Sequence, residues 1–124
     1  MDRFLAIGLG GFLGANTRYW VTTWAAERWG ATFPFGTLLI NVAGSFLLGL
    51  FLAATTQRII ADPRWRAFFT IGFLGAFTTF SAFTYESAQL LMGRAWWPGL
   101  GYLFANNAVG LAACVLGILL GRGR

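Results

Sequence analysis

The sequence predicts an all-α membrane protein with four transmembrane helices and no second domain. Hydrophobic residues make up 57% of its 124 residues and charged residues only 10%, whereas a soluble domain carries about 25% charged residues. The apolar residues fall into four runs separated by short polar stretches. Because a helix needs about 20 apolar residues to cross a bilayer, four spans use the whole chain. This composition excludes an ordinary soluble enzyme and a disordered tail.

The predicted spans form a single domain, residues 1–124, and cover approximately residues 4–25, 35–57, 67–91 and 98–121. Pro34, Pro63 and Pro98 lie at span boundaries, where a missing backbone donor does least harm. The six tryptophans also lie near boundaries, as the interfacial aromatic residues of membrane proteins do. A cleaved signal peptide is an alternative for the first run, but Asp2 at its start and Arg18 within it argue against that interpretation.

The arginines predict the orientation of the spans. The chain has nine arginines, four carboxylates, and neither lysine nor histidine. The side of the membrane that holds both termini carries Arg3, Arg58, Arg64, Arg66, Arg122 and Arg124, and the other side carries Arg28 and Arg94. The positive-inside rule places the first side in the cytoplasm and predicts a multi-pass protein of the cell membrane. Because these arginines flank spans, we expect them to meet anionic lipid headgroups and do not expect nucleic-acid binding.

Small residues predict where the helices touch. In lipid, helices associate through close packing and hydrogen bonds, so small and polar positions mark contact faces. Gly10 and Gly14 lie one turn apart in the first span. In the fourth span one stripe of a helix carries Asn107, Gly110, Cys114, Gly117 and Gly121. The lone Cys114 is therefore interpreted as a packing residue, without a disulfide partner.

A polar stripe crosses the second span. Thr37, Asn41 and Ser45 recur every four residues on an otherwise apolar helix. The two hydroxyls alone are compatible with bonding between helices. The carboxamide of Asn41 is harder to place, because it brings two donors and an acceptor to a depth where unmatched polar groups cost several kcal/mol.

The third span is unusual because residues 72–84 bring glycines, hydroxyls and aromatic rings to the middle of the membrane. Such a sequence weakens a helix, and discontinuous spans bind ions through freed carbonyls and helix ends. A break in mid-span is therefore expected. Phe77, Phe80 and Phe83 recur every three residues, which would keep them roughly on one side of a helix; aromatic packing in the core explains the spacing equally well.

The sequence contains no catalytic constellation. Histidine and lysine are missing, the lone cysteine lies in an apolar run, and the four acids lie near span ends. We therefore expect a passage or a scaffold and not an enzyme. Arg18 has two interpretations, since an arginine within a span either extends to the interface or faces a water-filled vestibule that attracts anions.

Three segments resemble the CrcB/Fluc fluoride channels: residues 11–19, residues 36–46 with their Gly-Thr-Leu-x-x-Asn-x-x-Gly motif, and residues 72–83 with Thr-Thr-Phe-Ser-x-Phe. The resemblance implies a passive, fluoride-selective channel that exports cytoplasmic fluoride. It further implies an antiparallel, dual-topology dimer with two pores and a central structural Na+.

The resemblance also implies roles for individual residues. The implied pore residues are Asn41, Phe80, Phe83, Ser81 and Thr37; Arg18 and Glu86 fall at a vestibule or pore end; the carbonyls of Gly75 and Thr78, at the break, hold Na+. Tyr102, Asn106 and Asn107 are candidates for further donors. Ala82 and Ala76 depart from the family, where threonine and glycine are usual, and the first departure removes a hydroxyl from the polar track.

Two other functions and two assemblies remain open at this point. A small multidrug-resistance exporter also has four short spans, but it relies on a carboxylate inside the first span, where this chain has Arg18 and only a terminal Asp2. A membrane scaffold without transport activity is the other alternative. An antiparallel homodimer needs both orientations in the membrane, and the arginine bias opposes this; pairing with an inverted relative would avoid the conflict.

Overall fold

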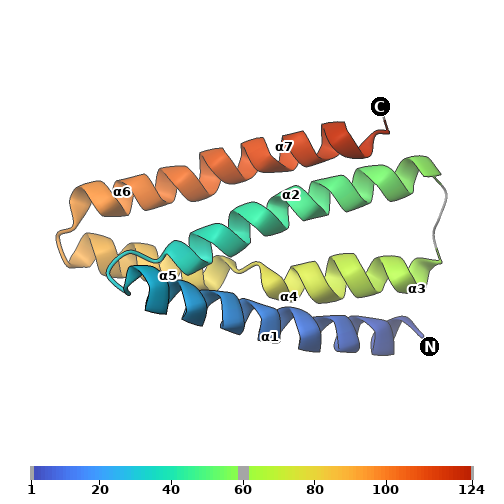
Figure 1. Ribbon diagram of the computed structural model, residues 1–124, viewed down its shortest axis with the longest axis horizontal. Helices are drawn as coiled ribbons and strands as arrows, with labels where there is room; N and C mark the ends of the chain where they lie inside the picture. Colours follow the sequence, from blue (N-terminus) through green and yellow to red (C-terminus); the bar gives the residue numbers. More distant parts are fainter. Residues whose placement is uncertain (1, 59–61, 124) are drawn as a thin grey trace.

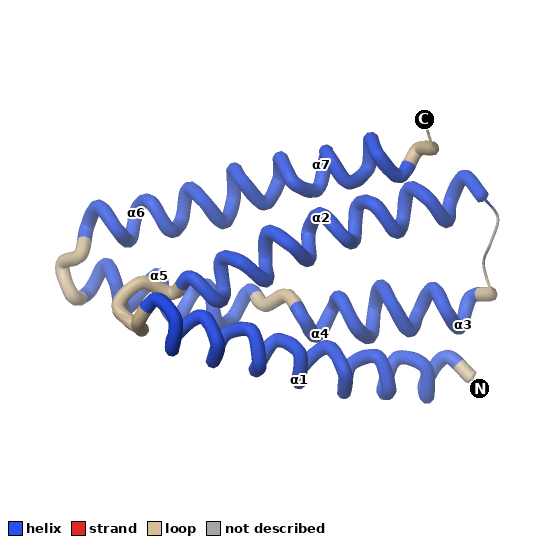
Figure 2. The backbone as a smooth tube through the Cα atoms, in the orientation of Figure 1, coloured by secondary structure: helices blue, strands red, loops and turns tan. Residues whose placement is uncertain are grey.

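A computed structural model describes residues 2–58 and 62–123 of the chain, and they form a bundle of long helices (Figure 1). The first rod is α1 (Arg3–Trp29) and the second is α2 (Phe35–Arg58). The third comprises α3 (Pro63–Arg66), the π-helical η1 (Ala67–Leu74), α4 (Gly75–Phe77) and α5 (Phe80–Met92). The fourth comprises α6 (Trp96–Phe104), the π-helical η2 (Ala105–Val109) and α7 (Gly110–Gly121). Figure 2 shows the interruption between α4 and α5. The described residues thus confirm the helical fold and the broken third helix.

The helices extend beyond the predicted spans. α1 continues to Trp29 and is followed by Gly30, whose positive φ of 86° ends the helix. The third rod begins at Pro63, because the Asp62 carboxylate accepts the Arg64 N–H and caps the helix. The Arg64 guanidinium also binds this carboxylate and lowers the pKa of Asp62 to about 2. Hydropathy marks the apolar part of a helix, whereas caps and glycines decide where its hydrogen bonds end.

Three segments of the described chain are long and apolar enough to cross a membrane: Phe35–Thr55, Pro63–Met92 and Trp96–Gly121. α1 is also long enough, at about 40 Å for a rise of 1.5 Å per residue, but it is more polar. It lies alongside α3 and α4 (Figure 1). Both ends of the chain lie at the same end of the bundle, together with the end of α2 and the start of α3 (Figure 1). This is the arrangement that an even number of spans produces.

The small residues lie where helices meet, as predicted. A Cβ at Gly10 or Gly14 would collide with the backbone of η1, so α1 packs directly on that segment. A Cβ at Gly121 would lie 2.5 Å from the carbonyl oxygen of Leu50, and one at Gly117 would collide with α2 in the same way. The pairs α1–η1 and α2–α7 are therefore in backbone contact, as membrane helices with small interfacial residues are.

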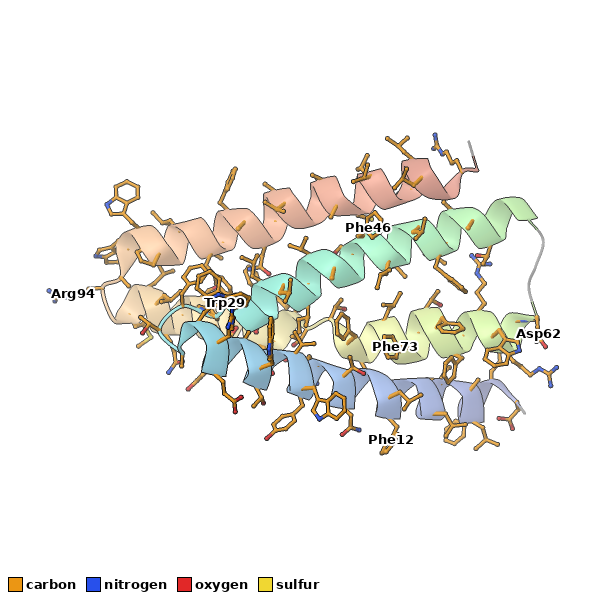
Figure 3. All side chains as sticks on the ribbon, viewed as in Figure 1. Phe12, Trp29, Phe46, Asp62, Phe73 and Arg94 are labelled. Carbon is orange, nitrogen blue, oxygen red and sulfur yellow. The ribbon has the colours of Figure 1, made fainter. Side chains whose placement is uncertain are left out.

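The buried core is small and lies beside the break. Ile40, Leu74 and Phe77 form it. Many large apolar side chains point outward instead, such as Phe12, which projects away from the bundle (Figure 3). This distribution suits a protein surrounded by hydrocarbon. Of the arginines that predict topology, Arg124 and the side chain of Arg58 lie outside the described residues.

Candidate functional site

The third helix breaks at Thr78 and Thr79, whose backbones are extended. The Thr78 N–H and hydroxyl both donate to the Leu74 carbonyl, which closes α4. The Thr79 hydroxyl accepts the N–H of Ala82 and caps α5. Gly75, which the resemblance placed at the break together with Thr78, lies at the start of α4, so the extended segment begins later than expected.

The side chain of Asn41 holds the break from α2. Its Oδ1 accepts the Thr79 N–H at 2.9 Å, and its Nδ2 donates to the Thr79 carbonyl at 3.1 Å. The same Nδ2 donates to Oδ1 of Asn106 at 3.0 Å. One carboxamide thus satisfies both backbone groups of a residue that has left the helix. Both of its amide hydrogens have acceptors in this conformation, which explains how Asn41 is tolerated in a span.

Arg18 reaches the same break from α1. Its Nε donates to the carbonyl of Ala76 at 3.0 Å, and the side chain is partly buried. Carbonyls in the last turn of a helix lack helical donors, so this bond satisfies one of them and places a positive charge at the negative end of α4. The sequence had suggested that Arg18 either extends to the interface or faces a water-filled vestibule, and neither interpretation included this contact. The bond uses the backbone of Ala76, so it does not depend on the side chain at that position.

The break also divides the three phenylalanines. Phe77 is buried in the core, whereas Phe80 is 76% exposed. Phe80 and Phe83 form a pair, with ring centroids 5.9 Å apart. Phe83 in turn packs on Tyr102, with centroids 5.5 Å apart. The expectation that all three phenylalanines share one side was wrong, because a spacing of three residues has this meaning only in a continuous helix.

Two hollows lie along the polar stripe of α2. The inner hollow, of about 240 Å³, is lined by Asn41, Ser45, Thr78, Thr79, Phe80, Phe83, Asn106 and Asn107. The end hollow, of about 420 Å³, is lined by Thr22, Ala26, residues 30–37, Glu86, Gln89 and Leu90. Thr37 therefore faces the end hollow, and Asn41 and Ser45 face the inner one. The stripe follows both.

Tyr102 links the two hollows. It is fully buried, and its hydroxyl donates to Oε1 of Glu86 at 2.7 Å in the end hollow. Its ring packs on Phe83, which lines the inner hollow. The Tyr102 carbonyl accepts a hydrogen bond from Nδ2 of Asn106, and Oδ1 of Asn106 accepts one from Nδ2 of Asn41. A continuous set of contacts therefore runs from the break to Glu86.

The remaining predicted residues fall around this set. The Ser81 hydroxyl lies 3.3 Å from that of Thr79, at the exposed start of α5. Thr79 itself was missed, although a threonine three residues before a helical N–H is a common N-cap. The partnership of Asn41 with Asn106 joins residues far apart in sequence, and no local pattern could have shown it.

The fold and site define a class: a small multi-pass membrane protein whose third helix breaks beside a polar stripe. The chain belongs to the CrcB-like family, described as "CrcB-like protein, Camphor Resistance (CrcB)", which matches residues 5–118. This confirms the resemblance.

Similar proteins include several whose printed name is "Fluoride-specific ion channel FluC". One, from Koribacter versatilis, is 49% identical over 92% of this chain and 90% of its own length. A relative from Chloroflexus aurantiacus is 43% identical over 98% of this chain and 97% of its own. Another, from Legionella pneumophila, is 43% identical over 96% of this chain and 89% of its own. The similarity thus extends over nearly the whole chain.

Proposed function

We propose that the protein is a fluoride channel that lets fluoride leave the cytoplasm passively across the cell membrane. The observation that carries this proposal is the polar stripe of α2, which runs along two hollows and meets the Phe80–Phe83 pair at the helix break. The relatives named as fluoride-specific ion channels support the choice of ion.

The groups around the hollows suit fluoride chemically. A small, strongly hydrated anion enters an apolar span only where donors replace its water. The Thr37 hydroxyl in the end hollow can donate, as can the Ser81 hydroxyl, which lies beside that of Thr79 at the inner hollow. Because α5 begins there, the positive end of its dipole faces that space. Ring edges of Phe80 and Phe83 carry partial positive charge and hold an anion weakly enough to release it.

The role proposed for Asn41 follows from its bonds. With both amide hydrogens engaged, it serves the path first by fixing the break and the start of α5. It lines the inner hollow all the same, and an exchange of the Asn106 bond for fluoride would free one donor. Arg18 and Glu86 mark pore ends in this scheme. Neither of these charged residues lines the inner hollow, so the part of the proposed path beside the phenylalanine pair contains neutral groups.

A second, inverted copy of the chain completes the path. The exposed Phe80 ring and the exposed start of α5 would otherwise face lipid beside a broken helix. Because backbone groups at membrane depth are tolerated only where protein or water covers them, this face needs a cover. An antiparallel dimer supplies it twice and forms two pores. An inverted relative of the chain would serve equally.

A structural Na+ fits the break. The carbonyls of Leu74, Ala76 and Thr79 accept hydrogen bonds from the side chains of Thr78, Arg18 and Asn41, respectively. The carbonyls of Gly75 and Thr78 belong to the freed end of α4. Carbonyl oxygens suit a hard cation. In the described residues no group of three or more His, Cys, Asp or Glu offers another metal site. The Gly75 and Thr78 carbonyls of both copies would hold the ion, which would offset their converging negative dipoles.

Fluoride efflux from liposomes loaded with potassium fluoride tests the proposal. The protein is purified in detergent and reconstituted into these liposomes. Once valinomycin removes the opposing voltage, the liposomes should release fluoride, which a fluoride electrode measures. Liposomes loaded with chloride are the control and should retain their anion. Equal passage of both anions would refute selectivity. No fluoride release would favour the scaffold, and drug transport driven by a proton gradient would favour the exporter.

A further inference from the structure

The end of the bundle that holds the termini contains a third hollow, of about 510 Å³, which the proposed fluoride path does not use. Its lining is mostly apolar and comes from α2, the start of the third rod and the end of α7: Leu50, Phe51, Ala54, Thr55, Trp65, Arg66, Phe69, Leu120, Gly121 and Gly123. We call it the arginine hollow, after Arg66. The rings of Phe51 and Phe69 lie 5.4 Å apart along its wall, and Trp65 stacks on Phe69.

Arg66 is the charged residue of this lining, and its guanidinium has no carboxylate partner among the described residues. Of the four side-chain carboxylates in the sequence, Asp62 is bound by Arg64 and Asp2 caps α1. Glu86 is bound by Tyr102, and Glu27 lies near the end of α1 farthest from the terminus. Among the described residues no carboxylate therefore neutralises Arg66, which is partly buried beside an apolar hollow and can offer its donors to a bound anion.

The position of the hollow indicates the kind of group. It lies where Pro63–Met92 begins and Trp96–Gly121 ends, which is the level of the membrane–water interface for both spans. Trp65 at its rim is the residue type that occupies this level. A ligand here meets hydrocarbon on one side and water on the other. It must itself be amphipathic, with an apolar part for the aromatic wall and a negative part for Arg66.

We propose that the arginine hollow binds one anionic phospholipid, with its phosphate on the Arg66 guanidinium and an acyl chain against Phe51 and Phe69. A guanidinium forms paired, charge-assisted hydrogen bonds to phosphate oxygens. Arg122, whose neighbours Gly121 and Gly123 line the hollow, adds positive potential at the same membrane level, which favours an anionic headgroup over a zwitterionic one. The proposal stands independently of the ion that the protein conducts.

Native mass spectrometry of the detergent-solubilised protein tests this binding. Phosphatidylglycerol and phosphatidylcholine with identical acyl chains are titrated in parallel, and the bound lipids are counted. The unmodified chain should retain phosphatidylglycerol preferentially. Arg66→Gln should weaken that binding by about fivefold, the effect of one interfacial arginine. Arg3→Gln removes the same charge from the same end of the bundle, on α1, and should leave the preference unchanged.

A second variant tests the apolar part of the site. Ala54→Leu fills the arginine hollow without changing charge, and should weaken binding of both lipids relative to the unmodified chain. Glycerophosphoglycerol, a headgroup without acyl chains, should not compete with phosphatidylglycerol. Equal losses in Arg66→Gln and Arg3→Gln, or competition by the free headgroup, would overturn the proposal. So would equal retention of the two lipids, which is the result expected if a second copy of the chain covers the hollow.

Discussion

Asn41 and Arg18 reach one helix break from opposite sides and satisfy different backbone groups of it. Asn41 binds the N–H and carbonyl of Thr79, and Arg18 binds the carbonyl of Ala76. An unpaired backbone group in hydrocarbon costs several kcal/mol. The two side chains offset this cost because they replace backbone hydrogen bonds that the break removes. In the proposed function they would act on the ion path through the backbone geometry that they hold.

The substitution Asn41→Asp should therefore damage both function and fold. The aspartate adds negative charge to the inner hollow and cannot donate to Thr79 or Asn106, so we expect fluoride flux to be suppressed and stability to fall by about 1–3 kcal/mol. Asn107→Asp is the matched control, because Asn107 lines the same hollow but, among the described residues, its side chain bonds within its own helix, to the Leu103 carbonyl. It should reduce flux with less loss of stability, as measured by thermal unfolding in detergent. Equal stability of the two variants would show that the hydrogen bonds between Asn41 and Thr79 do not stabilise the break.

Phe80 offers the cleaner test of the aromatic ring edges. Because its side chain is exposed, Phe80→Ile should leave folding unchanged and still reduce fluoride efflux from liposomes severalfold. Phe83→Ile should reduce efflux too, but Phe83 is buried against Tyr102, so a loss of packing would accompany it. Phe12→Ile, on the outward face of α1, is the control (Figure 3). Unchanged efflux in Phe80→Ile would remove ring edges from the mechanism.

For Arg18, the substitution with lysine keeps the charge and removes the Nε donor. Arg18→Lys should lower stability by about 1 kcal/mol or more, because the carbonyl of Ala76 loses its partner. A residue that only attracted anions at an entrance would tolerate this change. Thermal unfolding of Arg18→Lys is compared with that of Arg28→Lys, an exposed position on the same helix. If the two variants unfold at the same temperature, the contact with the break contributes nothing.

At the scale of elements, glycine contacts set the distance between helices. Gly44 shows how α2 accommodates the break, since a Cβ there would collide with the methyl group of Thr78. Gly14 brings α1 against the backbone of Phe73 in the same way. This approach places Arg18, one turn further along α1, within reach of Ala76. Helix contact and helix break therefore depend on each other.

Gly14→Ala should loosen this contact and cost about 1–3 kcal/mol, the usual price of overpacking. Gly8→Ala is the matched control on the same helix, because a Cβ there meets no atom within 4 Å. That change should be neutral or stabilise the helix by up to about 1 kcal/mol. Both values come from reversible unfolding in mixed micelles. If Gly14→Ala leaves the free energy of unfolding unchanged, close contact between α1 and η1 does not contribute to stability.

At the scale of the whole molecule, a single chain leaves its proposed path open on one side. The inner hollow includes the exposed Phe80, and the end hollow is bordered by the connection between α1 and α2. Closure by an inverted copy requires both orientations in one membrane. The excess of arginine that the sequence predicts on the side of the membrane holding both termini favours a single orientation, so sidedness is the decisive property of the proposed assembly.

We expect epitopes at the N-terminus to be found on both faces of the membrane in comparable amounts. Protease protection in intact and inverted vesicles measures this directly. Anionic lipid bound at the arginine hollow would offset the charge at whichever face it occupies. If every terminus lies in the cytoplasm, the homodimer is excluded, and an inverted relative must supply the second half.

The helical class, the four apolar runs, the glycine contact faces and the broken third helix could all be predicted from the sequence. These properties are local, since hydropathy, helix propensity and residue size act over a few turns. It also carried the family resemblance through three continuous motifs. The partners of the polar residues, in contrast, became visible when the helices were seen packed together. Asn41 with Thr79 and Asn106, and Arg18 with Ala76, join positions 38 to 65 residues apart. Such partners depend on how the helices pack, because a polar group in hydrocarbon must find its complement on whichever neighbour the packing brings within reach.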